Sequence, residues 1–219
     1  HYPLRRQRQM CIRDRATRSY FSERRYFEVN TPKIIATATE GGAALFPILY
    51  YDKEAFLTQS PQLYKEQLIL AFEKVFEIGP AFRAEQSRTL SHLSEFTSVD
   101  VEEGYVNYKD IIDTVEGLVK YIVKSVRNRC REDLELLKVD LHSYGKKFER
   151  YTYDKILDLL AERDFKVEWG EDLNTASLDE LAKILKGFYF ITDWPTSSKP
   201  FYIKPCLLYT SPSPRDRQK

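Results

Sequence analysis

Residues 82–102 read FRAEQSRTLSHLSEFTSVDVE. Arg83 and Glu85 lie two positions apart, so on a β-strand both side chains would point to the same face. A polar loop containing His92 follows, and the chain then alternates again as a second strand from Phe96. Such a hairpin offers a bidentate cation for a phosphate and a flat ring on which a base can stack. Any one of these residues fits an ordinary hairpin with a surface ion pair, so the prediction depends on their combination.

Residues 59–65, QSPQLYK, predict the start of a helix. Ser60 suits the N-cap, and Pro61 suits the first helical position. Gln62 and Lys65 are three residues apart and therefore neighbours on one helix face. An amide and an ammonium at a helix N-terminus, which itself favours anions, form a receptor for a carboxylate. A solvated lysine is the alternative interpretation.

Two segments nearer the N-terminus have less specific patterns. Residues 15–27 have helical spacing, residues 27–30 alternate as a strand, and Pro32 ends that strand. In residues 38–46, ATEGGAALF, Glu40 precedes two glycines, which make a pliable loop able to close a carboxylate over a small ligand. An ordinary turn explains this loop equally well.

Together these segments resemble the class II aminoacyl-tRNA synthetases. Residues 82–102 are similar to motif 2, residues 20–32 to motif 1, and residues 38–46 to the TEGGxxLF loop of that family. Residues 59–65 are nearly those of aspartyl-tRNA synthetases of the archaeal and eukaryotic type. The resemblance implies an α+β fold, a class II catalytic core with a mostly antiparallel sheet flanked by helices, incomplete at its C-terminus.

The resemblance also implies roles for individual residues. Arg83 is the expected catalytic residue, contacting the α-phosphate of ATP, and Lys65 is expected to pair with the side-chain carboxylate of the substrate aspartate. Pro32 is expected at the interface of a homodimer formed through motif 1. The expected aspartate-binding residues are Glu40, Ser60, Gln62, Leu63, Tyr64, Lys65 and Arg83. The expected ATP-binding residues are Arg83, Ala84, Glu85, Ser91, His92, Leu93 and Phe96.

One position departs from the family pattern. The family has Arg directly before the histidine of the motif 2 loop, whereas this chain has Ser91 there and Arg88 three residues earlier. One phosphate contact is therefore missing or has moved.

The function implied is that of an aspartate–tRNA ligase, which activates L-aspartate with ATP to aspartyl-adenylate and transfers it to aspartate tRNA. Lys65 favours aspartate, because a neutral asparagine amide would leave a buried ammonium unpaired. The alternatives are an asparaginyl-tRNA synthetase, a paralogue derived from the aspartyl enzyme, and a non-catalytic dimerisation or nucleic-acid-binding module.

The net charge of +1 is unevenly distributed. Residues 1–15 carry +4 and residues 206–219 carry +2, which leaves −5 for the remainder. Because the two ends fit no periodic pattern, residues 1–14 and 206–219 are interpreted as non-native flanks of a partial catalytic domain, residues 15–205. Motif 3, the anticodon-binding domain and the carboxylates that bind Mg²⁺ are expected outside this sequence, so the polypeptide alone is expected to be inactive or nearly so.

The remaining patterns predict further elements and a location. Helices are expected over residues 109–130, 153–164 and 177–186, and strands over residues 55–58, 75–80, 148–153, 188–195 and 199–203. In the first of these helices, a stripe of Ile112, Val115, Val119, Ile122 and Val126 is interpreted as core packing. No run of 18 apolar residues predicts a membrane span, and three cysteines without metal-ligand spacing suit the reducing cytoplasm.

Overall fold

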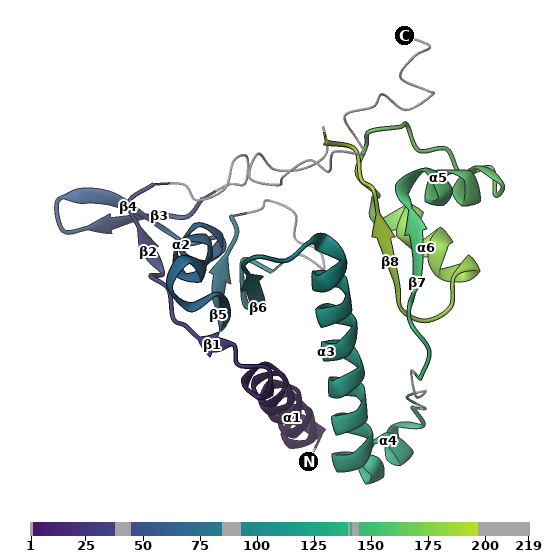
Figure 1. Cartoon of the computed structure of the whole chain (residues 1–219), viewed down its shortest axis with the longest axis horizontal. Helices are drawn as coiled ribbons and strands as arrows, with labels where there is room; N and C mark the ends of the chain where they lie inside the picture. The colour runs from purple at the N-terminus through teal and green to yellow at the C-terminus, as the bar shows by residue number, and fades with distance from the viewer. Residues whose placement is uncertain (1, 38–44, 85–92, 140, 142–144, 197–219) are drawn as a thin grey trace. The chain divides into compact units, whose positions relative to one another are not determined.

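The computed structural model describes residues 2–37, 45–84, 93–139, 141 and 145–196 (Figure 1). The chain divides into two compact units, residues 1–145 and residues 146–219. Each unit mixes helices and strands, which confirms the predicted α+β class. None of the described helices is long and apolar enough to cross a membrane.

The N-terminal unit contains two small sheets and four helices among its described residues. One sheet has the order β1-β5-β6 and is built from β1 (Phe27–Glu28), β5 (Lys74–Phe82) and β6 (Glu95–Glu103). The other has the order β2-β4-β3 and is built from β2 (Ile34–Ile35), β4 (Lys53–Leu57) and β3 (Pro47–Tyr50). All pairs are antiparallel except β1 with β5. The helices are α1 (Tyr2–Glu23), α2 (Gln62–Phe72), α3 (Tyr108–Arg129) and α4 (Arg131–Leu137).

The β5–β6 hairpin is the predicted motif 2 hairpin, and its register decides which side chains share a face. Glu77 lies opposite Asp100, and Ala81 lies opposite Phe96. Because side chains alternate along a strand, the odd-numbered residues of β5 and the even-numbered residues of β6 lie on one face. The other face carries Phe76, Ile78 and Val101, which pack with Tyr20, Phe21 and Tyr26 in the core of this unit.

The core of the N-terminal unit is aromatic. The side chain of Phe21 is fully buried and stacks on Phe76, with 4.8 Å between the ring centroids. Tyr20 and Tyr26 each meet Phe21 edge-on. The Tyr26 hydroxyl donates to Glu103 Oε2 at 2.5 Å, at the end of the hairpin. These rings fasten α1 to the apolar face of the hairpin.

Helix α3 lies against α1 at a close approach (Figure 1). A capping box of Asn107 and Asp110 begins the helix. A Cβ placed on Gly117 would lie 2.3 Å from the Tyr20 hydroxyl, which donates to the Thr114 carbonyl at 2.8 Å. Glycine therefore leaves room on α3 for the Tyr20 side chain to pack against the helix backbone.

The C-terminal unit contains β7 (Glu149–Thr152), α5 (Tyr153–Ala161), α6 (Thr175–Ile184) and β8 (Tyr189–Thr192). The two strands are parallel, and both helices bury their apolar faces in one cluster of Ile156, Leu160 and Leu181. The Tyr153 hydroxyl donates to the Glu171 carbonyl at 2.7 Å, which holds the intervening turn against α5.

Several predicted elements differ in detail. Helix α1 runs over Tyr2–Glu23 instead of residues 15–27, and it ends before residue 27 because Arg25 adopts a positive φ of 62° and turns the chain. The short elements β2, β3 and α4 were not predicted, and the predicted strand 199–203 lies outside the described residues. Residues Leu118 and Tyr121 of α3 pack against the aromatic core. The predicted core stripe of this helix is therefore only half-buried; it consists of Ile112, Val115, Val119, Ile122 and Val126.

Candidate active site

The face of the β5–β6 hairpin opposite the aromatic core holds a buried lysine between two carboxylates. Lys65 is only 3% exposed, and its Nζ lies 3.5 Å from Asp100 Oδ1 and 3.5 Å from Glu102 Oε2. The same Nζ donates to the Val101 carbonyl at 3.4 Å. A buried ammonium needs such partners, because desolvating an unpaired charge costs several kcal/mol. Asp100 and Glu102 therefore fix the position of the Lys65 amine.

Gln62 connects the first turn of α2 to the same strand. Its Nε2 donates to Glu102 Oε2 at 3.1 Å and to Glu66 Oε1 at 2.9 Å. Gln62 and Lys65 thus approach one carboxylate from adjacent positions of one helix face, as their spacing predicts.

The predicted cap of α2 is wrong by one residue. Pro61, not Ser60, is the N-cap, because the Pro61 carbonyl accepts the first helical hydrogen bond, from Lys65 N at 2.9 Å. Ser60 lies one position earlier, and its hydroxyl accepts a 3.3 Å hydrogen bond from Gln62 N. The Thr58 hydroxyl donates to the Ser60 carbonyl at 2.9 Å and so shapes the entry to the helix.

Arg83 directly follows β5 and lies against an aromatic ring. Its guanidinium carbon is 5.4 Å from the centroid of the Phe96 ring, within the range of a cation–π contact. Its backbone N–H donates to the Ser94 carbonyl at 3.0 Å, which continues the hairpin ladder by one step. The buried Nε of Arg83 has no hydrogen-bond partner among the described residues. A buried donor left unsatisfied is costly, so this group is suited to an incoming anion.

Lys65 and Arg83 lie over the same face of the hairpin. Lys65 contacts Asp100 and Arg83 contacts Phe96, and both partners are even-numbered residues of β6. Four residues separate these partners, a distance of roughly 13 Å along an extended strand. The hairpin therefore presents two cations on one surface.

A third charged group on this face holds the turn before β2. Glu77 is 2% exposed, and its carboxylate accepts hydrogen bonds from Thr31 N at 2.9 Å, Thr31 Oγ1 at 2.7 Å and Lys33 Nζ at 2.7 Å. The exposed Pro32 lies between these two residues and is therefore held beside β5. The sequence interpretation missed Glu77 and Lys33, although the odd position of Glu77 on β5 indicates that it shares a face with Arg83.

The other predicted site residues are distributed as follows. Leu63 and Tyr64 are half-buried on α2, Ala84 is half-buried after Arg83, and Leu93 is 62% exposed. Four predicted ligand-contacting residues lie outside the described residues: Glu40, Glu85, Ser91 and His92. In the described part of the chain, no group of three or more His, Cys, Asp or Glu side chains is arranged to hold a metal ion.

The fold and this two-cation hairpin agree with a match between residues 5–217 and the family described as tRNA synthetases class II (D, K and N). The chain belongs to this family, which confirms the resemblance seen in the sequence. Individual relatives are also similar to this chain in sequence. It is 48% identical over 191 residues to an aspartate–tRNA(Asp/Asn) ligase of Archaeoglobus fulgidus, covering 87% of this chain. It is 45% identical over 186 residues to an aspartate–tRNA(Asp) ligase of Picrophilus torridus, covering 84% of this chain.

Solved structures confirm the predicted class II fold. An asparaginyl-tRNA synthetase from Pyrococcus horikoshii, complexed with asparaginyl-adenylate, superposes with a TM-score of 0.87 at 33% identity over 93% of this chain. An aspartyl-tRNA synthetase from Entamoeba histolytica superposes with a TM-score of 0.72 at 30% identity over 91% of this chain. The chain spans 44% of the length of each of the two archaeal ligases and 48% of the Pyrococcus enzyme.

Proposed function

We propose that the protein to which this chain belongs is an aspartate–tRNA ligase. In the proposed reaction a carboxylate oxygen of aspartate attacks the α-phosphorus of ATP, and pyrophosphate leaves. The aspartyl group is then transferred from the adenylate to the 3′ end of aspartate tRNA, and AMP leaves. The observation that carries the proposal is the placement of Lys65 and Arg83 over one face of the β5–β6 hairpin.

Lys65 is the proposed specificity residue. Its amine is held by Asp100 and Glu102, so it does not need to reorganise when a third carboxylate, that of the substrate, arrives. Gln62 lies beside it and offers an amide for the same substrate. A carboxylate forms a stronger, charge-assisted bond to this ammonium than an asparagine amide can, so aspartate is preferred over asparagine.

Arg83 is the proposed catalytic residue. Charge develops on the oxygens of the α-phosphate during attack, and a fixed guanidinium stabilises that charge without reorganisation. The Phe96 ring holds the guanidinium on one side, and the same ring offers a surface for adenine. Magnesium and the remaining predicted ATP contacts stay predictions, and no step here depends on them.

A homodimer formed near Pro32 remains part of the proposal. Phe27 and Phe72 are 54% and 41% exposed, and their ring centroids lie 5.0 Å apart. Ile34, two residues after Pro32, is 48% exposed. Apolar side chains gathered at a surface favour burial against another molecule. The proposed reaction consumes ATP and tRNA, which agrees with the cytoplasm as the expected location.

The test uses the full-length gene and aspartate-dependent exchange of pyrophosphate into ATP, which reports the first step alone. Lys65→Gln should lower kcat/KM for aspartate about 100-fold, because removing one partner of a buried charge pair costs roughly 2–5 kcal/mol. Arg83→Ala should lower kcat by about 10²–10³, the usual effect of removing a donor to a developing charge. Lys53→Gln, a change at an exposed lysine, is the matched control and should leave both constants unchanged.

The same assay separates the alternatives. The Pyrococcus superposition favours an asparaginyl enzyme as the second candidate, and faster exchange with asparagine than with aspartate would establish it. Exchange with neither amino acid, together with tRNA binding, would indicate a non-catalytic module.

A further inference from the structure

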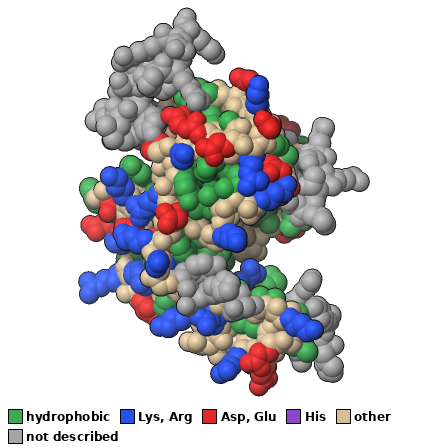
Figure 2. Space-filling view, turned by 90° about the vertical axis from the view of Figure 1, so that its right-hand side faces the viewer, with side chains coloured by type: hydrophobic (Ala, Val, Ile, Leu, Met, Phe, Trp, Pro, Cys, Tyr) green, Lys and Arg blue, Asp and Glu red, His purple; other side chains and the backbone are tan. Residues whose placement is uncertain are grey.

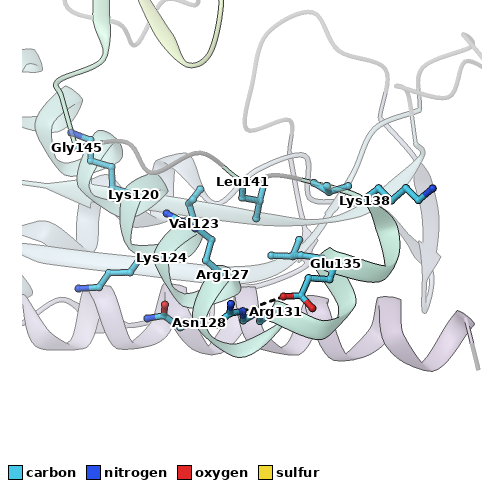
Figure 3. Close-up of a pocket in the computed structure, with 12 residues that line it drawn as sticks. Lys120, Val123, Lys124, Arg127, Asn128, Arg131, Glu135, Lys138, Leu141 and Gly145 are labelled. Carbon is cyan, nitrogen blue, oxygen red and sulfur yellow. Dashed lines mark hydrogen bonds and ion pairs between the residues drawn. The ribbon is translucent and has the colours of Figure 1, made fainter.

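A pocket at the far end of α3 from its capping box has a cation at five of its twelve lining positions. It lies between α3, α4 and the segment after α4, within the N-terminal unit, and has a volume of about 1090 Å³ (Figure 3). Its charged lining residues are Lys120, Lys124, Arg127, Arg131, Lys138 and Glu135. Five cations and one carboxylate give this lining a net charge of +4.

This charge contrasts with the rest of residues 16–205: the whole range carries a net charge of −5, so its residues outside the pocket lining together carry −9. In Figure 2, several lysine and arginine side chains lie among other side chains on the lower part of the face shown. A positive groove on an otherwise acidic chain attracts anions selectively, and solubility alone does not require such clustering.

Internal ion pairs neutralise only part of the groove. Lys120 pairs with Glu116 at 2.6 Å, and Arg131 pairs with Glu135 at 3.2 Å. The exposed side chains of Lys124, Arg127 and Lys138 form no ion pair with any described residue. These three cations are therefore available to a ligand.

The arrangement of the cations indicates an extended ligand. Lys120, Lys124 and Arg127 recur at one-turn intervals along α3, so they form a row with steps of about 5–6 Å. Figure 3 shows Lys124 and Lys138 at opposite ends of the pocket, with Arg127 between them. A single phosphate would meet one of these groups, whereas a chain of phosphates would meet them in succession.

We propose that this groove, between α3 and α4, binds the phosphodiester backbone of RNA. The groove is formed by elements separate from the hairpin face that carries Lys65 and Arg83, so it is a second contact surface. The choice of RNA over other polyanions rests on the proposed function, since tRNA is the polyanionic substrate of that reaction. Phosphate contacts of this kind position a nucleic acid without reading its sequence.

The first test measures binding of a fluorescently labelled aspartate tRNA transcript to the full 219-residue chain by anisotropy, across a series of salt concentrations. The triple variant Lys124→Gln, Arg127→Gln, Lys138→Gln should bind about 10- to 100-fold more weakly at 0.1 M salt. Its slope of log affinity against log salt should fall by about 2–3, since each phosphate contact contributes roughly 0.7–0.9. Glutamine keeps a good helix former at residues 124 and 127, and residue 138 lies just after α4, so circular dichroism should show unchanged folding.

The control carries the same loss of charge elsewhere. Lys53, Lys155 and Lys166 are exposed and form no ion pair with any described residue, so the triple change of these three to Gln should leave affinity within about threefold of the parent. Equal losses in the two triple variants, or no loss in either, would overturn the proposal. Inorganic polyphosphate that binds as tightly as the transcript and displaces it would show a general anion site and would also overturn it.

A second measurement needs no substitution. Bound tRNA should slow modification of Lys124 and Lys138 by an amine-reactive acetylating reagent, read by mass spectrometry, and should leave Lys53 unchanged. Absence of this protection would contradict the proposal. Failure of aspartate activation in the full-length enzyme, with groove protection intact, would refute the proposed function and leave the groove assignment standing.

Discussion

The two faces of the β5–β6 hairpin differ in chemistry although the same two strands form both. One face carries Phe76, Ile78 and Val101 and is covered by the aromatic side chains of α1. The other carries Glu77, Asp100 and Glu102 and contacts the ammonium groups of Lys33 and Lys65. Alternation along a strand therefore separates the part of the hairpin that stabilises the fold from the part that binds charge.

The buried charge of Lys65 on the polar face is not explained by stability alone. Burying an ion pair costs desolvation that its mutual attraction often fails to repay, so an apolar replacement is commonly as stable. The placement of Lys65 between two acids therefore agrees with the proposed role of this lysine in binding a carboxylate. Glu77 is the exception on this face, because its three hydrogen bonds fasten a neighbouring turn.

The largest effect on stability is expected from removing a buried aromatic ring from the apolar face. Phe76→Ala should destabilise the N-terminal unit by about 3–5 kcal/mol, because it removes a buried ring stacked on Phe21 and leaves a cavity. Urea denaturation followed by circular dichroism measures this change. Tyr51→Ala, at a residue 84% exposed, is the control and should change stability by less than about 0.5 kcal/mol. A loss below 1 kcal/mol for Phe76→Ala would contradict the assignment of this face to the core.

A smaller effect is expected at Glu77, the residue of the polar face that fastens a neighbouring turn. Glu77→Gln should cost about 1–3 kcal/mol, because Lys33 loses its charged partner while most of the shape is kept. The same urea experiment applies, with Glu95→Gln at an exposed position as control. If the two variants were equally stable, Glu77 would have no fastening role and would resemble its neighbours Asp100 and Glu102.

The next effect concerns a hydroxyl at the edge of the apolar face and depends on pH. Burial and the hydrogen bond to Glu103 raise the pKa of Tyr26 above its ordinary value of about 10. Because the pKa of Tyr26 is higher in the folded state than in the unfolded chain, the protonated hydroxyl stabilises the fold, and this contribution is fully present below pH 10. Above pH 10 the unfolded chain loses the proton first, so the contribution decreases as the pH rises.

Tyr26→Phe should therefore cost about 1 kcal/mol at pH 7 and should weaken the fall in stability above pH 10. Urea midpoints measured between pH 8 and pH 11 check this prediction. The fall should not vanish, because burial also raises the pKa values of Tyr20, Tyr153 and Tyr189. Parallel curves for parent and variant would exclude the proposed role of Tyr26.

The smallest effect is expected at Ser98, whose hydroxyl donates to Asp100 Oδ2. Ser98→Ala should cost about 0.5–1 kcal/mol, because Asp100 keeps Lys65 as a partner. The measurement is the shift of the urea midpoint, with Ser94→Ala at an exposed position as control. A loss of more than 2 kcal/mol in the free energy of unfolding would mean that the polar face stabilises the fold about as strongly as the apolar face does.

Local periodicity was sufficient to predict the hairpin, α2 and α3. It also placed Gln62 and Lys65 side by side, because neighbours on a helix are set by spacing within a few residues. The approach of Arg83 to Phe96 likewise follows from a short hairpin, in which facing positions are close in sequence. The family resemblance supplied the roles of these residues, which periodicity cannot provide.

The missed contacts have one physical cause. Lys65 meets Asp100 and Glu102, and Glu77 meets Lys33, across separations of 35 to 44 residues that depend on strand register. Register is set by tertiary packing and leaves no local pattern to read. The incorrect core prediction for the α3 stripe also arises from tertiary packing. The side of α3 that meets α1 is set at Gly117, where Tyr20 packs against the helix. Glycine adds nothing to hydrophobic periodicity, so the sequence pattern does not reveal this side.

Gly117 has one further consequence, for how the sequence can change. The space that a methyl group would need at this position is filled by the end of the Tyr20 ring, which is itself anchored to a carbonyl of the opposite helix. Alanine, normally the better helix former, would here require the Tyr20 side chain to shift and its hydrogen bond to Thr114 to change. Positions 20 and 117 form a size-matched pair, a constraint that residue-by-residue helix scales do not contain.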